Sequence, residues 1–329
     1  IIGGNGADVM QGDDGNDTLY GGNGDDRITG DSGDDIIRGS AGNDTIDGGA
    51  GTDLIDFSDA ANAINFTLNQ GENFSDSQGY WSTGALAGIG IDAYKNIEGV
   101  IGSAFNDTIG GSEWGDVLVG AAGADVLTGN AGSDRFVYNA TAASSDSNAV
   151  AMDTITDFHG VNDTSGAAKD QIDVGALLGA TNLVWGGTTP TSHGVWYGIE
   201  GGDPYVYADV DGNTATPELK INLEGVTYDL TLDDFIGVNR PPVAQDVSAS
   251  GDEDTTIIVK LAGTDVDGAV VSYTLTSLPM NGTLYTDGEL EEPAVTDTAY
   301  TTNTFFFQPN ENFNGTVSFQ YAVTDDQGA

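Results

Sequence analysis

A nine-residue repeat dominates the first 137 residues of the chain. Every block has Asp at position 6 and a large apolar residue at position 8. Position 4 is Gly in eight blocks, whereas Phe105 and Trp114 replace it in the other two. Self-similarity at a fixed short period is typical of a solenoid, in which each repeat packs on its neighbours. The blocks begin at Gly3, Gly12, Gly21, Gly30, Gly39 and Gly48, and again at Gly102, Gly111, Gly120 and Gly129.

The residue types within a block indicate a turn followed by a short strand. Glycines permit the positive φ angles of a tight turn, and the three last residues have a length and pattern suited to a strand with position 8 facing inward. Two blocks complete an 18-residue coil, so aspartates 18 residues apart are predicted to stack. Two carboxylates at ~4 Å repel by roughly 4 kcal/mol at an effective dielectric constant of ~20. A hard cation bound by oxygen ligands removes this repulsion, and we expect the block to be unfolded without it.

The block closely resembles the RTX (repeats-in-toxin) β-roll family, whose consensus is GGxGxDxUx. The resemblance implies a right-handed parallel β-roll that binds several Ca2+ ions between loops two repeats apart. One loop supplies the carbonyls of positions 2 and 4 and its aspartate, and the next supplies the carbonyls of positions 1 and 3 and its aspartate. Transferred to this sequence, the four sites of the first block pair Gly4, Gly6 and Asp8 with Gly21, Asn23 and Asp26; Asp13, Gly15 and Asp17 with Gly30, Ser32 and Asp35; Gly22, Gly24 and Asp26 with Gly39, Ala41 and Asp44; and Asp31, Gly33 and Asp35 with Gly48, Ala50 and Asp53.

The second group of repeats predicts two further sites, which involve Asp107, Asp116, Asp125 and Asp134. The large residues at position 4 imply different turns at the first two of these aspartates. The step from Asp53 to Asp107 is 54 residues, a multiple of nine, so the interruption keeps the register of the repeat. Within it, residues 63–68 alternate like a strand, and 97–101 lead back into the repeat. Tyr80 and Trp81 are interpreted as local packing, with a sugar or partner contact as the alternative.

Residues 138–239 resemble the C-terminal region of RTX domains in serralysin-type secreted proteases. The similar stretches are 153–158, 169–173, 223–226 and 232–236. A solenoid end exposes unpaired backbone, so a β-rich cap is expected here. Asp209 and Asp211 begin a segment that is typical either of a calcium loop or of a β-turn.

Residues 239–243, with Pro241 and Pro242, indicate a stiff linker. Residues 240–329 resemble bacterial cadherin-like tandem domains, which are immunoglobulin-like sandwiches, through the stretches 253–255, 265–268, 309–315 and 322–328. Strands are predicted at 255–261, 270–275, 304–307 and 317–323. Asp265 and Asp267, together with Glu253 and Asp325, are either calcium ligands or ordinary acidic turn residues. The fold class is therefore all-β: a β-roll at 1–137, a cap at 138–239 and a β-sandwich at 240–329.

Composition excludes several function classes. The chain has 52 acidic and 8 basic residues, a net charge of −44, so nucleic acid and anionic membrane surfaces are not expected partners. Acidity of this kind is also typical of adaptation to salt. There is no cysteine to form disulfides, and no apolar run has the length of a membrane-spanning helix. The two histidines, His159 and His193, lie in no zinc or triad motif.

We therefore expect a non-catalytic, calcium-folded segment of a large secreted or cell-surface RTX adhesin that is exported by type I secretion. Its expected partners are calcium and either cell-surface glycans or proteins, or further repeats of the same chain. Two alternatives remain open. One is the non-catalytic tail of a secreted RTX hydrolase such as a protease, lipase or epimerase, and the other is an extracellular lattice or filament protein.

Overall fold

The computed structural model describes residues 1–68, 80, 81, 90, 92–139, 152–177 and 183–328. Their regular structure consists mainly of strands, together with the 3-10 helix η2 (Leu232–Asp234). The chain divides into two compact units, Ile1–Val238 and Asn239–Ala329. Within the described part, no helix is long and apolar enough to cross a membrane.

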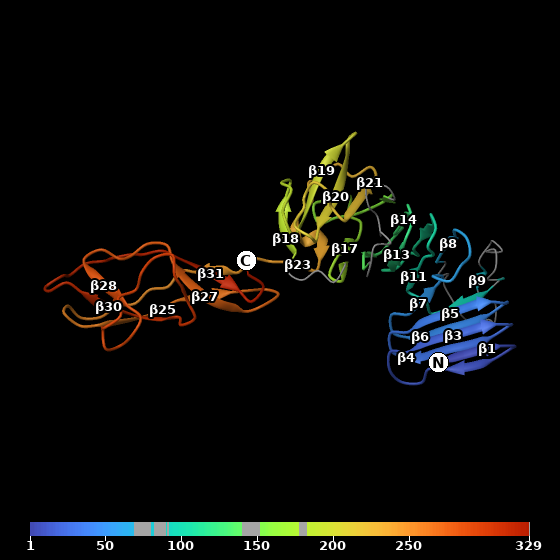
Figure 1. Cartoon of the computed structure of the whole chain (residues 1–329), viewed down its shortest axis with the longest axis horizontal. Coiled ribbons are helices and arrows are strands. Elements are labelled where there is room, and N and C mark those ends of the chain that lie inside the picture. Colours follow the sequence, from blue (N-terminus) through green and yellow to red (C-terminus); the bar gives the residue numbers. More distant parts are fainter. Residues whose placement is uncertain (69–79, 82–89, 91, 140–151, 178–182, 329) are drawn as a thin grey trace. The chain divides into compact units, whose positions relative to one another are not determined.

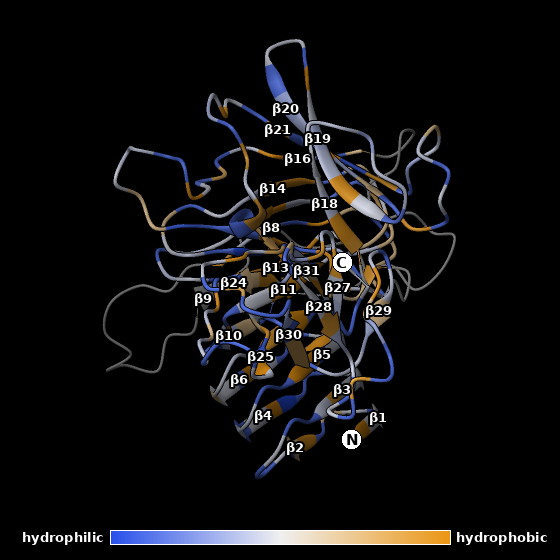
Figure 2. Cartoon of the chain, turned by 90° about the vertical axis from the view of Figure 1, so that its left-hand side faces the viewer, coloured by the Kyte–Doolittle hydropathy of each residue, from blue (hydrophilic) through white to orange (hydrophobic). Residues whose placement is uncertain are grey.

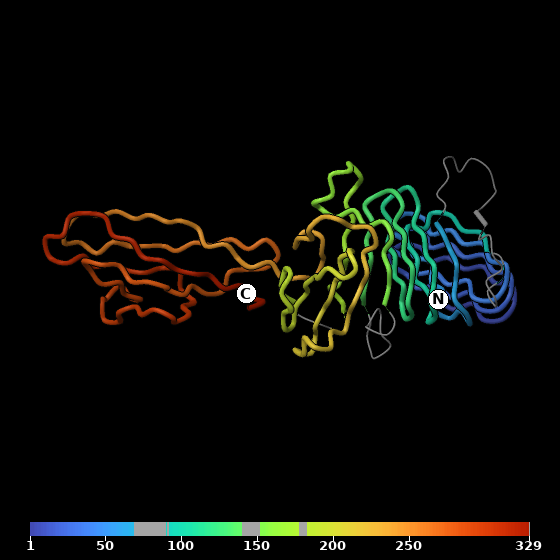
Figure 3. The backbone as a smooth tube through the Cα atoms, turned by 90° about the horizontal axis from the view of Figure 1, so that it is seen from above, coloured from blue at the N-terminus to red at the C-terminus, as the bar shows by residue number. Residues whose placement is uncertain are grey.

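The first unit is a parallel β-roll whose coils follow one another along the chain (Figures 1 and 3). One face is a nine-stranded sheet in the order β1-β3-β5-β7-β11-β13-β15-β17-β22, with every pair parallel. Leu19 pairs with Ile37, which is the predicted 18-residue step. The strands are β1 (Ile2–Asn5), β3 (Thr18–Asn23), β5 (Ile36–Ala41), β7 (Leu54–Asp56), β11 (Gly99–Ile101), β13 (Val117–Val119), β15 (Arg135–Val137), β17 (Gln171–Asp173) and β22 (Phe235–Ile236).

The alternate strands form two sheets, which the insertion separates: its strand β10 pairs with β6 of the first sheet, and its strand β8 pairs with β12 of the second. The first sheet has the order β2-β4-β6-β10-β9, and its stacked strands β2, β4 and β6 can be followed in Figure 2. The second has the order β23-β18-β19-β20-β21-β16-β14-β12-β8. The first comprises β2 (Val9–Gln11), β4 (Arg27–Ser32), β6 (Thr45–Ala50), β10 (Ala93–Lys95) and β9 (Tyr80–Trp81); the second comprises β8 (Asn65–Thr67), β12 (Thr108–Gly110), β14 (Val126–Thr128), β16 (Asp153–Ile155), β18 (Leu183–Gly187), β19 (Gly194–Glu200), β20 (Asp203–Asp209), β21 (Leu219–Leu223) and β23 (Val238–Asn239).

The strands predicted inside the insertion are present: β8 lies within 63–68, and β11 returns the chain to the repeat. Most of the segment 69–90, for which a sugar or partner contact was considered, lies outside the described residues. Its residues Tyr80 and Trp81 form β9, which pairs antiparallel with β10.

The core of the roll is a stack of the position-8 side chains. All ten are buried: Met10, Leu19, Ile28, Ile37, Ile46, Ile55, Ile109, Leu118, Leu127 and Phe136. The same apolar cluster continues through Ile155 and Ile172 to Val238. The roll and the segment that we expected as a cap therefore share one core. β16 still pairs parallel with β21, and the sheet then continues antiparallel through β21, β20 and β19, which gives the parallel coils paired neighbours at this end.

The second unit is an immunoglobulin-like sandwich. Its sheets are β25-β30-β28, β29-β27-β31 and the pair β24-β26. Leu275, Leu284 and Phe305 are buried in a core to which both three-stranded sheets contribute. Three of the four predicted strands are found close to their expected places, whereas the last begins at Tyr321, four residues after the predicted start at 317. The strands are β24 (Val243–Gln245), β25 (Ile257–Lys260), β26 (Ala262–Thr264), β27 (Val270–Leu275), β28 (Gly282–Tyr285), β29 (Ala299–Tyr300), β30 (Thr304–Pro309) and β31 (Tyr321–Asp325).

Candidate metal centre

The position-6 aspartates form two ladders along the roll, one at each edge. In each ladder, the backbone N–H of one aspartate donates to the Oδ1 atom of the aspartate one coil further on. The first ladder joins Asp8 to Asp26 and Asp26 to Asp44, both at 2.8 Å. The second joins Asp17 to Asp35 at 2.8 Å and Asp35 to Asp53 at 2.9 Å. The stacking predicted from the 18-residue spacing is thus present.

In most of these aspartates the second carboxylate oxygen is buried without a protein partner. The Oδ2 atoms that are buried without a hydrogen bond include those of Asp8, Asp26, Asp35, Asp44, Asp53 and Asp134. A buried oxygen of this kind is unfavourable unless a proton or a cation satisfies it. Burial raises the pKa of Asp44 and of Asp53 to about 6, and that of Asp134 to about 8. A bound cation would keep these groups ionised and supply the missing partner.

The glycine at position 1 leaves room for a carboxylate and a carbonyl oxygen to converge. A Cβ atom on Gly3 would lie 2.8 Å from Asp8 Oδ2 and 2.6 Å from the carbonyl oxygen of Gly21. At Gly12 the corresponding distances are 2.9 Å to Asp17 Oδ2 and 2.5 Å to the Gly30 carbonyl. These carboxylates and carbonyls are the ones expected to share an ion. The space that a side chain would fill is therefore lined by oxygen ligands.

The other predicted carbonyls are also directed from loop to loop. The position-3 carbonyls of Asn23, Ser32, Ala41 and Ala50 accept N–H bonds from the position-4 glycines one coil earlier, at 2.6, 2.7, 2.7 and 2.9 Å. Each keeps a second lone pair. At position 2, Gly22 has φ +104°, and a Cβ there would lie 2.1 Å from the Gly4 carbonyl oxygen. This close approach explains why residue 22 is glycine.

The first two aspartates of the second block differ from the rest. Ser103 and Ser112 occupy position 2 of their blocks, and each donates its backbone N–H and its hydroxyl to the aspartate of the same block. Asp107 also accepts the N–H of Ile64 at 2.8 Å. Both oxygens of Asp107 and of Asp116 are therefore satisfied by the protein. Asp107 and Asp116 are therefore not among the proposed calcium ligands. The sequence signal is serine at position 2 combined with a large residue at position 4, since Ser40, in a block with glycine at position 4, donates to Asp59 and leaves Asp44 Oδ2 without a partner.

Four further acidic residues extend the ladders and were not among the predicted ligands. Asp92 and Glu98, in the insertion, accept the N–H groups of Asp44 and Asp53 at 2.9 and 3.0 Å. Asp153 and Asp170 continue the ladders from Asp125 and Asp134, at 2.8 and 2.9 Å. Three of them immediately precede a strand, and Asp153 is the first residue of β16. All four show the order acidic residue, any residue, apolar residue, which is the pattern of positions 6 to 8. This three-residue pattern, which lacks the repeat's glycines, is the sequence feature from which these four residues could have been predicted.

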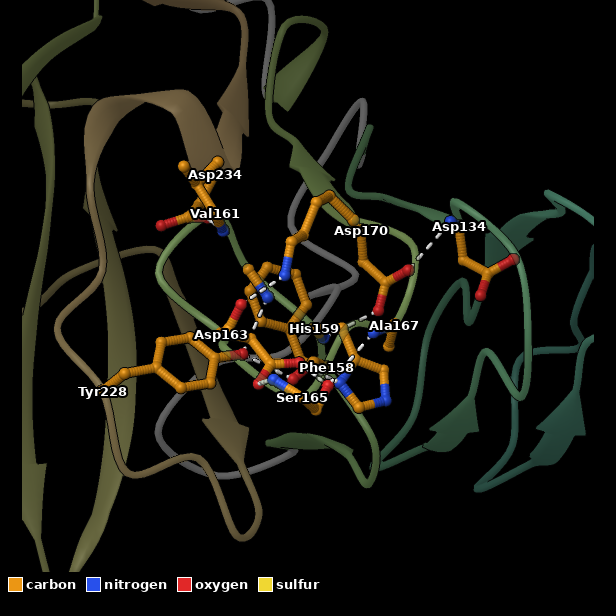
Figure 4. Close-up of polar contacts among 12 residues, drawn as sticks. Asp134, Phe158, His159, Val161, Asp163, Ser165, Ala167, Asp170, Tyr228 and Asp234 are labelled. Carbon is orange, nitrogen blue, oxygen red and sulfur yellow. Dashed lines mark hydrogen bonds and ion pairs between the residues drawn. The ribbon is translucent and has the colours of Figure 1, made fainter.

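The ladder that passes through Asp134 is closed by protein groups at Asp170, as Figure 4 shows. Asp170 Oδ1 accepts the N–H of Asp134, and its Oδ2 accepts the N–H of His159 at 2.8 Å. Tyr228 braces this turn, since its hydroxyl donates to the Phe158 carbonyl and accepts the Gly160 N–H, both at 2.7 Å. His159 is thus a turn residue, as the sequence indicated.

The remaining predicted ligands lie in two places. Asp209 and Asp211 lie at the β20–β21 connection. In the second unit, Arg240 N–H donates to Asp267 Oδ2 at 3.0 Å, and Asp267 N–H donates to Asp265 Oδ1 at 3.4 Å. Asp265 Oδ2 is buried without a partner. A Cβ on Gly268 would meet this oxygen at 2.8 Å, so Asp265 remains a candidate ligand. Glu253 instead lines a pocket of about 550 Å³ with residues of 246–259 and 307–321.

The ladders consist of carboxylate and carbonyl oxygens, which are the ligands of calcium. Comparison with family models identifies RTX calcium-binding nonapeptide repeats at 2–37, 29–62 and 110–140, and a bacterial Ig domain at 239–329. The nonapeptide repeats of this family bind calcium ions. Comparison with curated proteins gave no match.

Among solved structures, the AlgE6R2 subunit of the mannuronan C5-epimerase from Azotobacter vinelandii is 21% identical, with a TM-score of 0.33 over 55% of this chain and 93% of that one. The AlgE6R3 subunit of the same enzyme is 20% identical, with a TM-score of 0.21 over 78% and 93%. The extracellular lipase LipA from Serratia marcescens is 17% identical, with a TM-score of 0.25 over 69% and 40%. The chain thus carries RTX calcium-binding nonapeptide repeats at 2–62 and 110–140, followed by a bacterial Ig domain at 239–329.

Proposed function

We propose that the chain is a non-catalytic, calcium-folded segment of a large extracellular or cell-surface adhesin. One observation carries the proposal: the ladder aspartates bury carboxylate oxygens that no protein group satisfies, in a chain that continues into a bacterial Ig domain. The buried oxygens support folding that depends on calcium, and the Ig domain is typical of a protein built from successive extracellular modules.

Calcium concentration would control when the roll folds. With a net charge of −44, the calcium-free chain repels itself and favours extended conformations. Extracellular calcium modules bind with dissociation constants of about 10⁻⁴ to 10⁻³ M, so the roll would stay unfolded inside the cell and fold outside. This order suits export of an unfolded chain through a type I secretion channel.

Adhesion is tested with beads that carry the full chain. We expect the beads to bind to surfaces displaying cell-surface glycans or proteins in about 1 mM calcium, and to detach in chelator. Beads carrying the chain with Asp35→Asn, which removes a ladder carboxylate, provide the matched control and should bind less. If no such surface retains the beads in calcium, the adhesin proposal is wrong, and the tail of a secreted hydrolase becomes the better hypothesis.

A further inference from the structure

Three carboxylates meet at the β20–β21 connection, outside the nonapeptide repeats. Asp209 is the last residue of β20, Glu218 immediately precedes β21, and Asp211 lies between them. One ligand atom from each lies within 4.8 Å of the others. The family matches end at residue 140 and resume at 239, so neither includes this connection.

Asp209 is fully buried, and one of its carboxylate oxygens has no hydrogen-bond partner. Its side chain has an exposed fraction of 0%. Oδ2 accepts the backbone N–H of His193 at 2.8 Å, whereas Oδ1 is buried without a hydrogen bond. An ionised carboxylate in this position needs a second partner. The two nearby carboxylates cannot provide one, since an ionised carboxylate accepts hydrogen bonds and donates none.

The connection holds the other two carboxylates in place. Glu218 accepts the N–H of Val210 at 2.7 Å, and Asp211 accepts the N–H of Asn213 at 2.8 Å. Gly212, with φ +90°, packs so closely on the preceding turn that a Cβ there would lie 2.9 Å from His193 Cε1. No ion pair among the described residues includes any of the three acidic groups. Their charge is therefore uncompensated by the protein.

We propose that Asp209, Asp211 and Glu218 bind a calcium ion that is separate from the ions of the roll. Calcium accepts oxygen ligands at 2.3–2.6 Å in flexible geometry, so oxygens on opposite sides of one ion are up to about 5 Å apart. The 4.8 Å limit on the three ligand atoms fits this separation. Zinc favours nitrogen and sulfur ligands, and magnesium requires a tighter octahedral shell. The ion would tie the 210–218 connection to the turn at 192–193.

Native mass spectrometry of the full chain in about 1 mM calcium tests this site by counting bound ions. The variants are Glu218→Gln, which keeps an acceptor for the Val210 N–H, and Asp211→Asn, which alters an exposed side chain and leaves the core intact. The matched control is Glu224→Gln, an exposed acid just beyond β21 for which no side-chain contact is found among the described residues. Each of the first two should carry one calcium fewer than the unsubstituted chain, and the control should carry the same number.

If Asp211→Asn and Glu218→Gln both keep the full number of ions, the site does not exist. If Glu218→Gln loses several ions through unfolding, Asp211→Asn alone decides. The result is independent of the proposed function. A roll that folds without calcium would overturn that function, yet the loss of one ion in these variants would still establish the site. A roll that folds on calcium, with unchanged counts in both variants, would overturn only the site.

Discussion

Replacing Asp35 by Asn tests whether the unsatisfied ladder oxygens bind calcium. Asp35 is fully buried and lies between two ladder neighbours: it accepts from Asp17 at 2.8 Å and donates to Asp53 at 2.9 Å. Asparagine retains an Oδ1 acceptor for the Asp17 N–H, so the substitution removes only the charge and the second carboxylate oxygen. Because an ion is proposed on either side of Asp35, up to two calcium ions depend on it.

The magnitude follows from linkage between calcium binding and folding. An ion held at 100 times its dissociation constant stabilises the folded state by about 2.7 kcal/mol, so the loss of two ions costs up to about 5 kcal/mol. The substitution also removes two like-charge contacts, each of which lowers the stability of the calcium-free folded state. The net loss at saturating calcium should therefore be smaller than about 5 kcal/mol.

The assay is urea unfolding of the full chain, followed by circular dichroism at a series of calcium concentrations. Each ion released on unfolding adds about 1.4 kcal/mol to the free energy of unfolding per tenfold increase in calcium. Asp35→Asn should lower this slope by one to two ions. The matched control is Asp116→Asn, at an equally buried position where Ser112 already satisfies the carboxylate. It should cost about 1–3 kcal/mol at every calcium concentration and leave the slope unchanged.

Equal slopes for the unsubstituted chain and Asp35→Asn would refute the assignment of calcium to the ladder. A slope lowered as much by Asp116→Asn as by Asp35→Asn would refute the distinction between unsatisfied and serine-bound aspartates.

Three further predictions concern pH, glycine and the end of the roll. Burial raises the folded-state pKa of Asp44 to about 6 and of Asp134 to about 8, so the calcium-free folded state binds more protons than the unfolded chain between pH 4 and those values. Without calcium, the folding equilibrium should therefore shift toward the unfolded chain from pH 5 to pH 8, whereas the gain on adding calcium should grow; circular dichroism in chelator and in calcium at both pH values checks the two signs. Gly22→Ala should lower the melting temperature more than Gly6→Ala. Both glycines have positive φ, but only a Cβ at Gly22 would meet backbone, the Gly4 carbonyl oxygen at 2.1 Å. Thermal melts in calcium compare the two variants, and equal melting temperatures would contradict the close approach. Tyr228→Phe should lower the free energy of unfolding by about 1–3 kcal/mol, because the Tyr228 hydroxyl bonds to two backbone groups of the last turn. An unchanged midpoint of urea unfolding would show that these two hydrogen bonds do not stabilise the fold.

The roll can be predicted from the sequence because the nine-residue period of the repeat determines which residues pair and stack. Each repeat places one apolar side chain in the core, and two successive repeats place one aspartate at each edge. The spacing therefore predicts the 18-residue pairing of Leu19 with Ile37. The two ladders follow from the same spacing. The glycines needed at the closest approaches also repeat, which made the turns recognisable.

Ladder positions outside the glycine-rich repeats are harder to predict from the sequence. Asp153 and Asp170 continue the ladders without a Gly-x-Gly turn, because long connections replace the tight loops. At Asp107 and Asp116 the aspartate and the apolar position are kept, but Phe105 and Trp114 replace the position-4 glycine. The position-2 serines there donate hydrogen bonds to carboxylate oxygens that would otherwise need an ion. Glu218 joins Asp209 only through the pairing of β20 with β21, a three-dimensional contact that no local spacing specifies.

The central claim, that calcium folds the roll, is tested most directly by titrating the chelator-treated full chain with calcium while recording far-ultraviolet circular dichroism. We expect a cooperative gain of β-structure at about 10⁻⁴ to 10⁻³ M calcium and no comparable change with magnesium. A spectrum in chelator that already shows the full β-content, and does not change on adding calcium, would contradict the account.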